Sequence, residues 1–169
     1  MVAVKKEIGK PKAQSSGSLI VVNLRGLVNT RAPVRATLEQ LHVIKRFNST
    51  IVPDDLVHRG MLRSAKEHVA WMKADASLVE KLLKERSEVS DGHRFPESGL
   101  KGMGFASFTE LANKIVVGEV RLDGSQGMRQ FFRLNSPKGG FKKSIRRPYS
   151  DGGILGENPE LSKIIEKML

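Results

Sequence analysis

The feature that most constrains the fold is the alternation of short apolar runs with stretches of helical periodicity in residues 19–73. Leu19–Leu24 is rich in branched apolar residues, which predicts a central β-strand. Thr50–Val52 and Val69–Met72 have the same character and predict two further short strands. A chain with three such strands in this span must place helices between them.

Two helices are predicted in those intervals. Apolar residues recur at helical spacing over Val34–Arg46, and Pro33 suits the first helical position. Asp54 or Asp55 can cap the second helix, and Leu62 marks its buried side. The β-α-β-α-β order predicts an α/β (α+β) fold of the ferredoxin-like kind, in which helices cover a small sheet.

Residues 75–128 are predicted to form a mainly helical extension. Ser77 can cap one helix, and Ser107 with Glu110 fits a capping box before another that ends near Gly118. A last helix is expected near the C-terminus, with Asn158 as its cap. The sequence thus predicts five parts: a disordered basic tail (residues 1–18), a core (19–74), a helical extension (75–128), a basic segment (129–149) and a C-terminal helix (150–169).

The formal net charge of +11 is unevenly distributed along the 169 residues. Residues 1–17 carry +3, the basic segment (residues 129–149) carries +7 with no acidic residue, and the other 131 residues carry only +1. A nearly neutral body with two cationic extensions is typical of nucleic-acid-binding proteins. The tail has little apolar surface to bury, so it is expected to be disordered.

The basic segment reads RQFFRLNSPKGGFKKSIRRPY. Residues 136–140, SPKGG, cannot continue a helix, because proline lacks an amide hydrogen and paired glycines are costly to hold still. This backbone can approach another surface closely with cations on both sides, which suits a phosphate backbone. The simpler interpretation is a solvated, flexible basic loop.

Several function classes find no support in the sequence. Without cysteine, disulfides, zinc ribbons and thiol catalysis are excluded, and no apolar run approaches the roughly 18 residues that span a bilayer. Residues 139–144, GGFKKS, only resemble a phosphate-binding loop, and the four histidines lack metal-ligand spacing. We therefore expect a soluble intracellular protein with no catalytic site, cofactor, metal, membrane or small-molecule substrate.

The small aromatic content bears on how RNA would be held. Aromatic residues make up 5% of the chain, and Leu19–Leu24 contains none. Modules that stack bases carry aromatics on their central strands. Trp71 is interpreted as a core residue, so binding should use cations and backbone and recognise RNA shape.

Two stretches carry a family resemblance. Leu41–Val52 (LHVIKRFNSTIV) resembles the helix-to-strand segment of the L-thirty family of large-subunit ribosomal proteins, whose eukaryotic counterpart is called L-seven. Leu134–Lys143 (LNSPKGGFKK) resembles the proline-glycine-glycine basic segment of the long form of that family. The likeness covers Leu19–Leu169, whereas the short bacterial form would correspond only to Leu19–Lys73. The length favours the archaeal type.

The resemblance implies an antiparallel three-stranded sheet, an added C-terminal subdomain and a structural role on large-subunit ribosomal RNA near the 5S RNA, beside neighbouring large-subunit proteins. Positions matched to the family's motifs would lie against RNA: Arg46, Asn48, Lys138, Gly139, Gly140, Lys142 and Lys143. Five further RNA-binding candidates follow from charge and placement alone: Arg31, Arg35, Lys45, Arg146 and Arg147.

Two other functions remain open at this point. An RNA-binding regulator or processing factor outside the ribosome would share the charge pattern, but it predicts a single-strand sequence preference. A nucleotide-using enzyme would need residues 139–144 to act as a degenerate phosphate loop.

Overall fold

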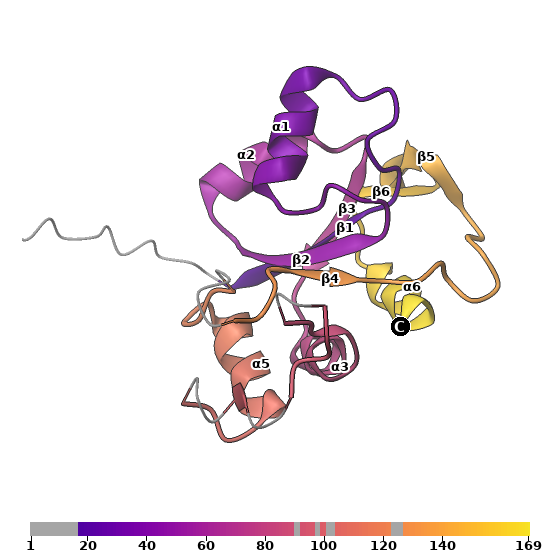
Figure 1. Ribbon diagram of the computed structural model, residues 1–169. Helices are drawn as coiled ribbons and strands as arrows, with labels where there is room; N and C mark the ends of the chain where they lie inside the picture. The colour runs from indigo at the N-terminus through magenta and orange to yellow at the C-terminus, as the bar shows by residue number, and fades with distance from the viewer. Residues whose placement is uncertain (1–16, 90–91, 97–98, 101–103, 123–126) are drawn as a thin grey trace, which may run out of the picture.

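The computed structural model describes residues 17–89, 92–96, 99–100, 104–122 and 127–169. The predicted disordered tail, except Gly17 and Ser18, lies outside the described residues. Figure 1 shows the helices and strands of the described part in chain order. Their bounds are β1 Ser18–Asn23, α1 Ala32–Gln40, β2 Asn48–Pro53, α2 Leu56–Ser64, β3 Val69–Lys73, α3 Ala76–Arg86, α5 Phe108–Val117, β4 Phe131–Arg133, β5 Ser144–Pro148, η1 Tyr149–Asp151, β6 Gly153–Glu157 and α6 Leu161–Met168.

Strand β1 lies at the centre of an antiparallel trio, as predicted. It pairs with β2 on one side and with β3 on the other, so that Ile20 has partners on both. All six residues of β1 are buried, because helices cover both faces of the sheet (Figure 1). Leu19 and Val21 face the apolar cluster under α1 and α2, and Ile20 and Val22 face the larger cluster under α3, α5 and α6. The α/β class and the ferredoxin-like core are confirmed.

Helix α1 is shorter than predicted, since it ends at Gln40 and not at Arg46. The chain leaves the helix where His42 adopts a left-handed φ of 57°. Val43 is then buried, and its carbonyl accepts a hydrogen bond of 2.7 Å from the Asn23 side chain. Apolar spacing continued past Gln40 because these loop residues also enter the core, which periodicity alone does not separate from a helix.

In the helical extension, the predicted cap of one helix is confirmed and the predicted cap of the other is wrong. Ser107 accepts the Glu110 N–H at 3.3 Å and Gly118 ends α5 at a φ of 87°, both as predicted. Helix α3, however, is preceded by Asp75, and the Ser77 hydroxyl donates to the Asp75 carboxylate at 2.6 Å. The serine therefore lies in the first turn and not at the cap.

Three strands from the C-terminal part widen the sheet to the order β4-β2-β1-β3-β6-β5. Strand β4 pairs antiparallel with β2, while β6 runs parallel to β3 and β5 parallel to β6. The sequence did not predict these strands, because they are three to five residues long and β5 exposes four of its five residues. Strand pairing, and not apolar patterning, creates them.

Helix α6 packs on the protein's own core through Leu161, Ile165 and Met168. The prediction of Asn158 as the cap is wrong, because α6 begins later and Glu160 is the residue at the cap position. The Asn158 side-chain oxygen accepts the Glu160 N–H at 2.9 Å, just before the helix. Within the described ranges, no helix has the length and apolar character needed to cross a membrane.

Candidate RNA interface

The structure joins the two stretches that carried the family resemblance. Asn48 at the start of β2 pairs with Arg133 of β4, and the Leu134 N–H donates to the Phe47 carbonyl at 3.0 Å. The rings of Phe47 and Phe141 then lie with centroids 6.1 Å apart, tilted by 32°. This contact fixes residues 134–143, here called the basic turn, against the loop that precedes β2.

Arg46 is held beside this aromatic pair. Its guanidinium lies 4.6 Å from the centroid of the Phe47 ring, and its Nε donates to the Leu24 carbonyl at 3.0 Å. Phe47 has a left-handed φ of 66°, and its N–H donates to the Asn23 carbonyl at 2.6 Å. A stacked, hydrogen-bonded guanidinium loses less freedom on meeting a phosphate than a mobile one.

The basic turn is anchored at the C-terminal end of α6. The N–H groups of Asn135 and Lys138 each donate at 2.9 Å, to the carbonyls of Met168 and Lys167. These bonds satisfy helix-end carbonyls that have no partner within the helix. The solvated, flexible loop of the simpler interpretation is thus not what the structure shows, because the backbone of the basic turn is bonded to the folded core.

Gly139 and Gly140 form the tip of the basic turn. Both have left-handed φ values, 81° and 70°, and the Gly140 N–H donates to the Pro137 carbonyl at 2.9 Å. Neither glycine has another atom within 4 Å of the position a Cβ would take, so the backbone at this tip is open. Lys138 and Lys142 flank it and are exposed.

Strand β5 extends the basic segment along the sheet edge. Arg146 and Arg147 are both exposed on it. The backbones of β5 and β6 lie so close together that a Cβ on Gly153 would collide with the Arg147 carbonyl. Lys143 differs from its neighbours, since its ammonium group pairs with Glu160 at 2.7 Å. Sequence reasoning missed this partner, which lies 17 residues away in the chain.

The remaining candidates are more scattered. Arg31 precedes α1, Arg35 pairs with Glu39 at 3.2 Å, and Lys45 is exposed beside Arg46. Within the part of the chain that the structure describes, no hydrogen bond or ion pair joins Arg31 or Arg35 to the basic segment. Asn48 is 5% exposed, so its side chain offers little surface for a contact with RNA.

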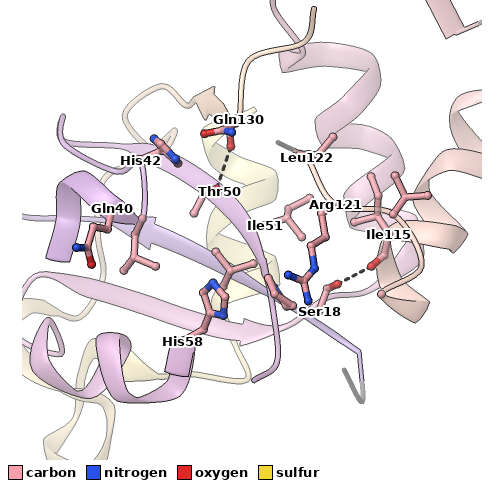
Figure 2. A pocket seen from close by; sticks show the side chains of 15 residues that line it. Ser18, Gln40, His42, Thr50, Ile51, His58, Ile115, Arg121, Leu122 and Gln130 are labelled. Carbon is pink, nitrogen blue, oxygen red and sulfur yellow. Dashed lines mark hydrogen bonds between the residues drawn. The ribbon is translucent and has the colours of Figure 1, made fainter. Parts of the chain in front are cut away.

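A cavity of about 200 Å³ beside β2 has the polar lining that an enzyme site requires, but its hydroxyls are engaged (Figure 2). Thr50 donates to the Gln130 carbonyl at 2.9 Å and Ser18 donates to the Ile115 carbonyl at 2.5 Å. Burial, the largest effect on the ring, lowers the pKa of His58. The two hydroxyls are thus bonded to backbone carbonyls, and among the described contacts neither is hydrogen-bonded to His58 as a nucleophile would be to its base. No three potential metal-binding side chains gather among the residues described.

Known proteins with similar sequences show which class of protein this chain resembles. Large ribosomal subunit protein uL30 of Ignicoccus hospitalis is 37% identical over 153 residues, which cover 89% of this chain and 96% of the relative. The proteins of the same name from Korarchaeum cryptofilum and Aeropyrum pernix are 33% and 34% identical, over 89% and 88% of this chain and 94% and 97% of those relatives. No protein-family model matches the chain.

These similarities extend over nearly the full length of archaeal ribosomal proteins. The chain belongs to the uL30 family of large ribosomal subunit proteins. The predicted family and its long archaeal type are confirmed.

Proposed function

We propose that this protein is a non-catalytic constituent of the large ribosomal subunit, where it binds and stabilises folded ribosomal RNA. The proposal rests on the contact between Phe47 and Phe141. This contact joins the loop at Arg46 and the basic turn into a single surface. Cations held on a rigid surface suit a folded RNA whose phosphates have fixed positions. The archaeal relatives named as large ribosomal subunit proteins support the same role.

The contacts are assigned to three groups of residues. Arg46, Lys138, Lys142, Arg146 and Arg147 neutralise phosphates, and the open backbone of Gly139 and Gly140 allows close approach of the RNA strand. Lys143 joins them when a phosphate replaces Glu160. Arg31 and Arg35 at the start of α1, and Lys45 beside Arg46, are assigned as further single contacts to phosphate. Asn48 lies buried at the start of β2, after these cations in the chain.

The position within the particle follows from the family resemblance. We expect the basic segment to face large-subunit RNA near the 5S RNA, beside neighbouring ribosomal proteins, in the cytoplasm. Footprinting of ribosomal RNA on intact large subunits, with and without the protein, tests this placement. Protection confined to a region remote from the 5S RNA would contradict the position but not the RNA binding.

RNA binding itself is tested with a matched pair of triple variants. Lys138→Gln, Lys142→Gln and Arg147→Gln together should weaken binding to large-subunit RNA and reduce the slope of log affinity against log salt by about 3. Lys81→Gln, Lys84→Gln and Lys114→Gln make the same charge change on α3 and α5. Equal losses of RNA affinity in both variants would show that the protein attracts RNA only through its net charge, which would contradict the assigned contacts. A regulator outside the ribosome would mostly fail to sediment with large subunits.

A further inference from the structure

A groove of about 700 Å³ lies between the segment that follows α2 and the β5–η1–β6 edge. Trp71 of β3 lines it, together with Tyr149 of η1. Its volume falls within the range of small-molecule and cofactor sites in proteins. Neither the sequence nor the proposed function gives this groove an occupant.

The two aromatic side chains are half-buried. Trp71 packs against the apolar cluster under α1 and α2, and also borders the groove. Tyr149 borders the groove as well, and the Lys143 ammonium lies 5.2 Å from the centroid of its ring. Trp71 is thus held by the core and Tyr149 by its contact with Lys143, and aromatic rings that are partly exposed in this way are what unpaired nucleic-acid bases stack on.

Three exposed cations from separate parts of the chain line the same groove: Arg25, Lys66 and Arg146. The Arg25 guanidinium is held by a hydrogen bond of 3.1 Å to the Glu67 carbonyl. Within the described residues, neither Lys66 nor Arg146 takes part in an ion pair. Cations beside the aromatic rings can bind the phosphate of a nucleotide whose base is stacked on those rings.

Two carboxylates, those of Glu67 and Glu157, also line the groove. They disfavour a densely anionic ligand such as a polyphosphate. They can instead accept hydrogen bonds from the amino or imino groups on the edge of a base. A cationic peptide would satisfy the carboxylates but would face three cations, so the balance of charge favours a ligand with one anionic group, a flat ring and N–H donors.

We propose that this groove binds an unpaired RNA nucleotide, with the base against Trp71 and Tyr149 and its phosphate near Lys66 and Arg25. Bases inside a duplex cannot offer their faces, so the nucleotide is one extruded from a bulge or loop. The inference rests on the proposed function, since it assigns a second contact to the same RNA-binding protein.

Trp71 is the single tryptophan of the chain and reports directly on the groove. The full-length protein is titrated with two RNA hairpins of equal length, one with a single-nucleotide bulge and one fully paired. We expect the bulged hairpin to quench the tryptophan fluorescence and to bind about tenfold more tightly than the paired hairpin. The paired hairpin should leave the fluorescence unchanged. The paired hairpin measures the electrostatic binding of the basic segment alone.

Variants locate the effect. Lys66→Gln with Tyr149→Leu should remove the preference for the bulge and leave the affinity for the paired hairpin within about twofold. Lys66→Gln alone should reduce the preference in part, which keeps the test valid if the double variant is poorly folded. Lys84→Gln removes one charge on α3 and should change neither value.

Equal affinity for the two hairpins with unchanged fluorescence would overturn the inference and leave the proposed function intact. Quenching by an arginine-rich peptide but not by the bulged hairpin would assign the groove to a protein segment and also overturn it. Failure of the proposed function gives another result, in which neither hairpin binds at moderate salt and the protein does not sediment with large subunits.

Discussion

The ammonium group of Lys143 lies 2.7 Å from a carboxylate oxygen of Glu160, so this cation of the basic segment is paired within the protein. The hydrogen bond to Glu160 raises the pKa of Lys143, and the same bond lowers the pKa of Glu160. Both side chains are about half exposed, at 46% and 47%, and exposed ion pairs contribute little to stability. A phosphate can therefore take the place of Glu160 at small cost.

This relationship predicts a substitution that strengthens RNA binding. Glu160→Gln should raise the affinity for large-subunit RNA about threefold, because it frees Lys143 and removes a negative charge beside the basic segment. Filter binding at several salt concentrations measures the change. Glu166→Gln is the matched control, since Glu160 directly precedes α6 and Glu166 lies within it, but Glu166 pairs with Lys81 of α3. An equal gain in both variants would show that only net charge matters.

A second prediction concerns the aromatic contact that joins the loop at Arg46 to the basic turn. Phe141→Ala should lower the free energy of unfolding by about 1–2 kcal/mol, because Phe141 is half-buried, and RNA affinity should fall about fivefold as the turn loses its anchor. Urea unfolding and filter binding measure the two effects. Phe95 is also half-buried against the same core, so Phe95→Ala should cost similar stability and leave RNA affinity unchanged. If Phe141→Ala leaves RNA affinity unchanged, the contact has no role in presenting the cations.

Two glycine substitutions should change stability in opposite directions. Gly153→Ala should destabilise the fold by about 2 kcal/mol or more, because the new methyl group meets the Arg147 carbonyl where β5 runs against β6. Gly60→Ala should stabilise it by about 0.5–1 kcal/mol, since Gly60 lies within α2 with open space around it. Thermal unfolding of both variants checks the pair. A stable Gly153→Ala protein would mean that β5 does not lie against β6.

The pair of Asp54 and Arg59 predicts a dependence of stability on pH. The Arg59 hydrogen bond lowers the pKa of Asp54 below its ordinary value of 3.8, and the Arg59 side chain donates to the second carboxylate oxygen at 2.7 Å. Because the folded-state pKa is the lower one, this stabilisation is present above about pH 4 and is lost as the pH falls through the folded-state pKa.

Asp54→Asn should therefore reduce the urea midpoint at pH 7, and the difference from the parent protein should shrink as the pH falls below about 4. Asp151→Asn is the control, because Asp151 is exposed and bonds only the neighbouring Ser150 hydroxyl among the described contacts. A constant difference between parent and Asp54→Asn across this pH range would assign the effect to something other than the charge.

The β-α-β-α-β core was predictable because its signals are local. Leu19–Val22 is apolar throughout since both sheet faces are covered, and Ser107 and Gly118 set the start and the end of α5 through bonds within a few residues. The end of α1 was not predictable, because Val43 has left the helix but its apolar side chain is still buried in the same cluster as Leu19 and Val21 of β1. The strands β4 and β6 were missed for the same reason, since each pairs with a strand remote in sequence. Strand β5 was missed because it is an exposed edge strand that pairs only with β6.

By itself, the sequence determined where the cations are concentrated, which segments have the composition of a core, and the family of the protein. Tertiary structure alone decided that Phe141 meets Phe47, that Lys143 meets Glu160, and that Trp71 and Tyr149 border one groove. Charge and local periodicity are properties of neighbouring residues. A contact between distant residues depends on strand pairing and helix packing over the whole chain, and only the folded molecule brings them together.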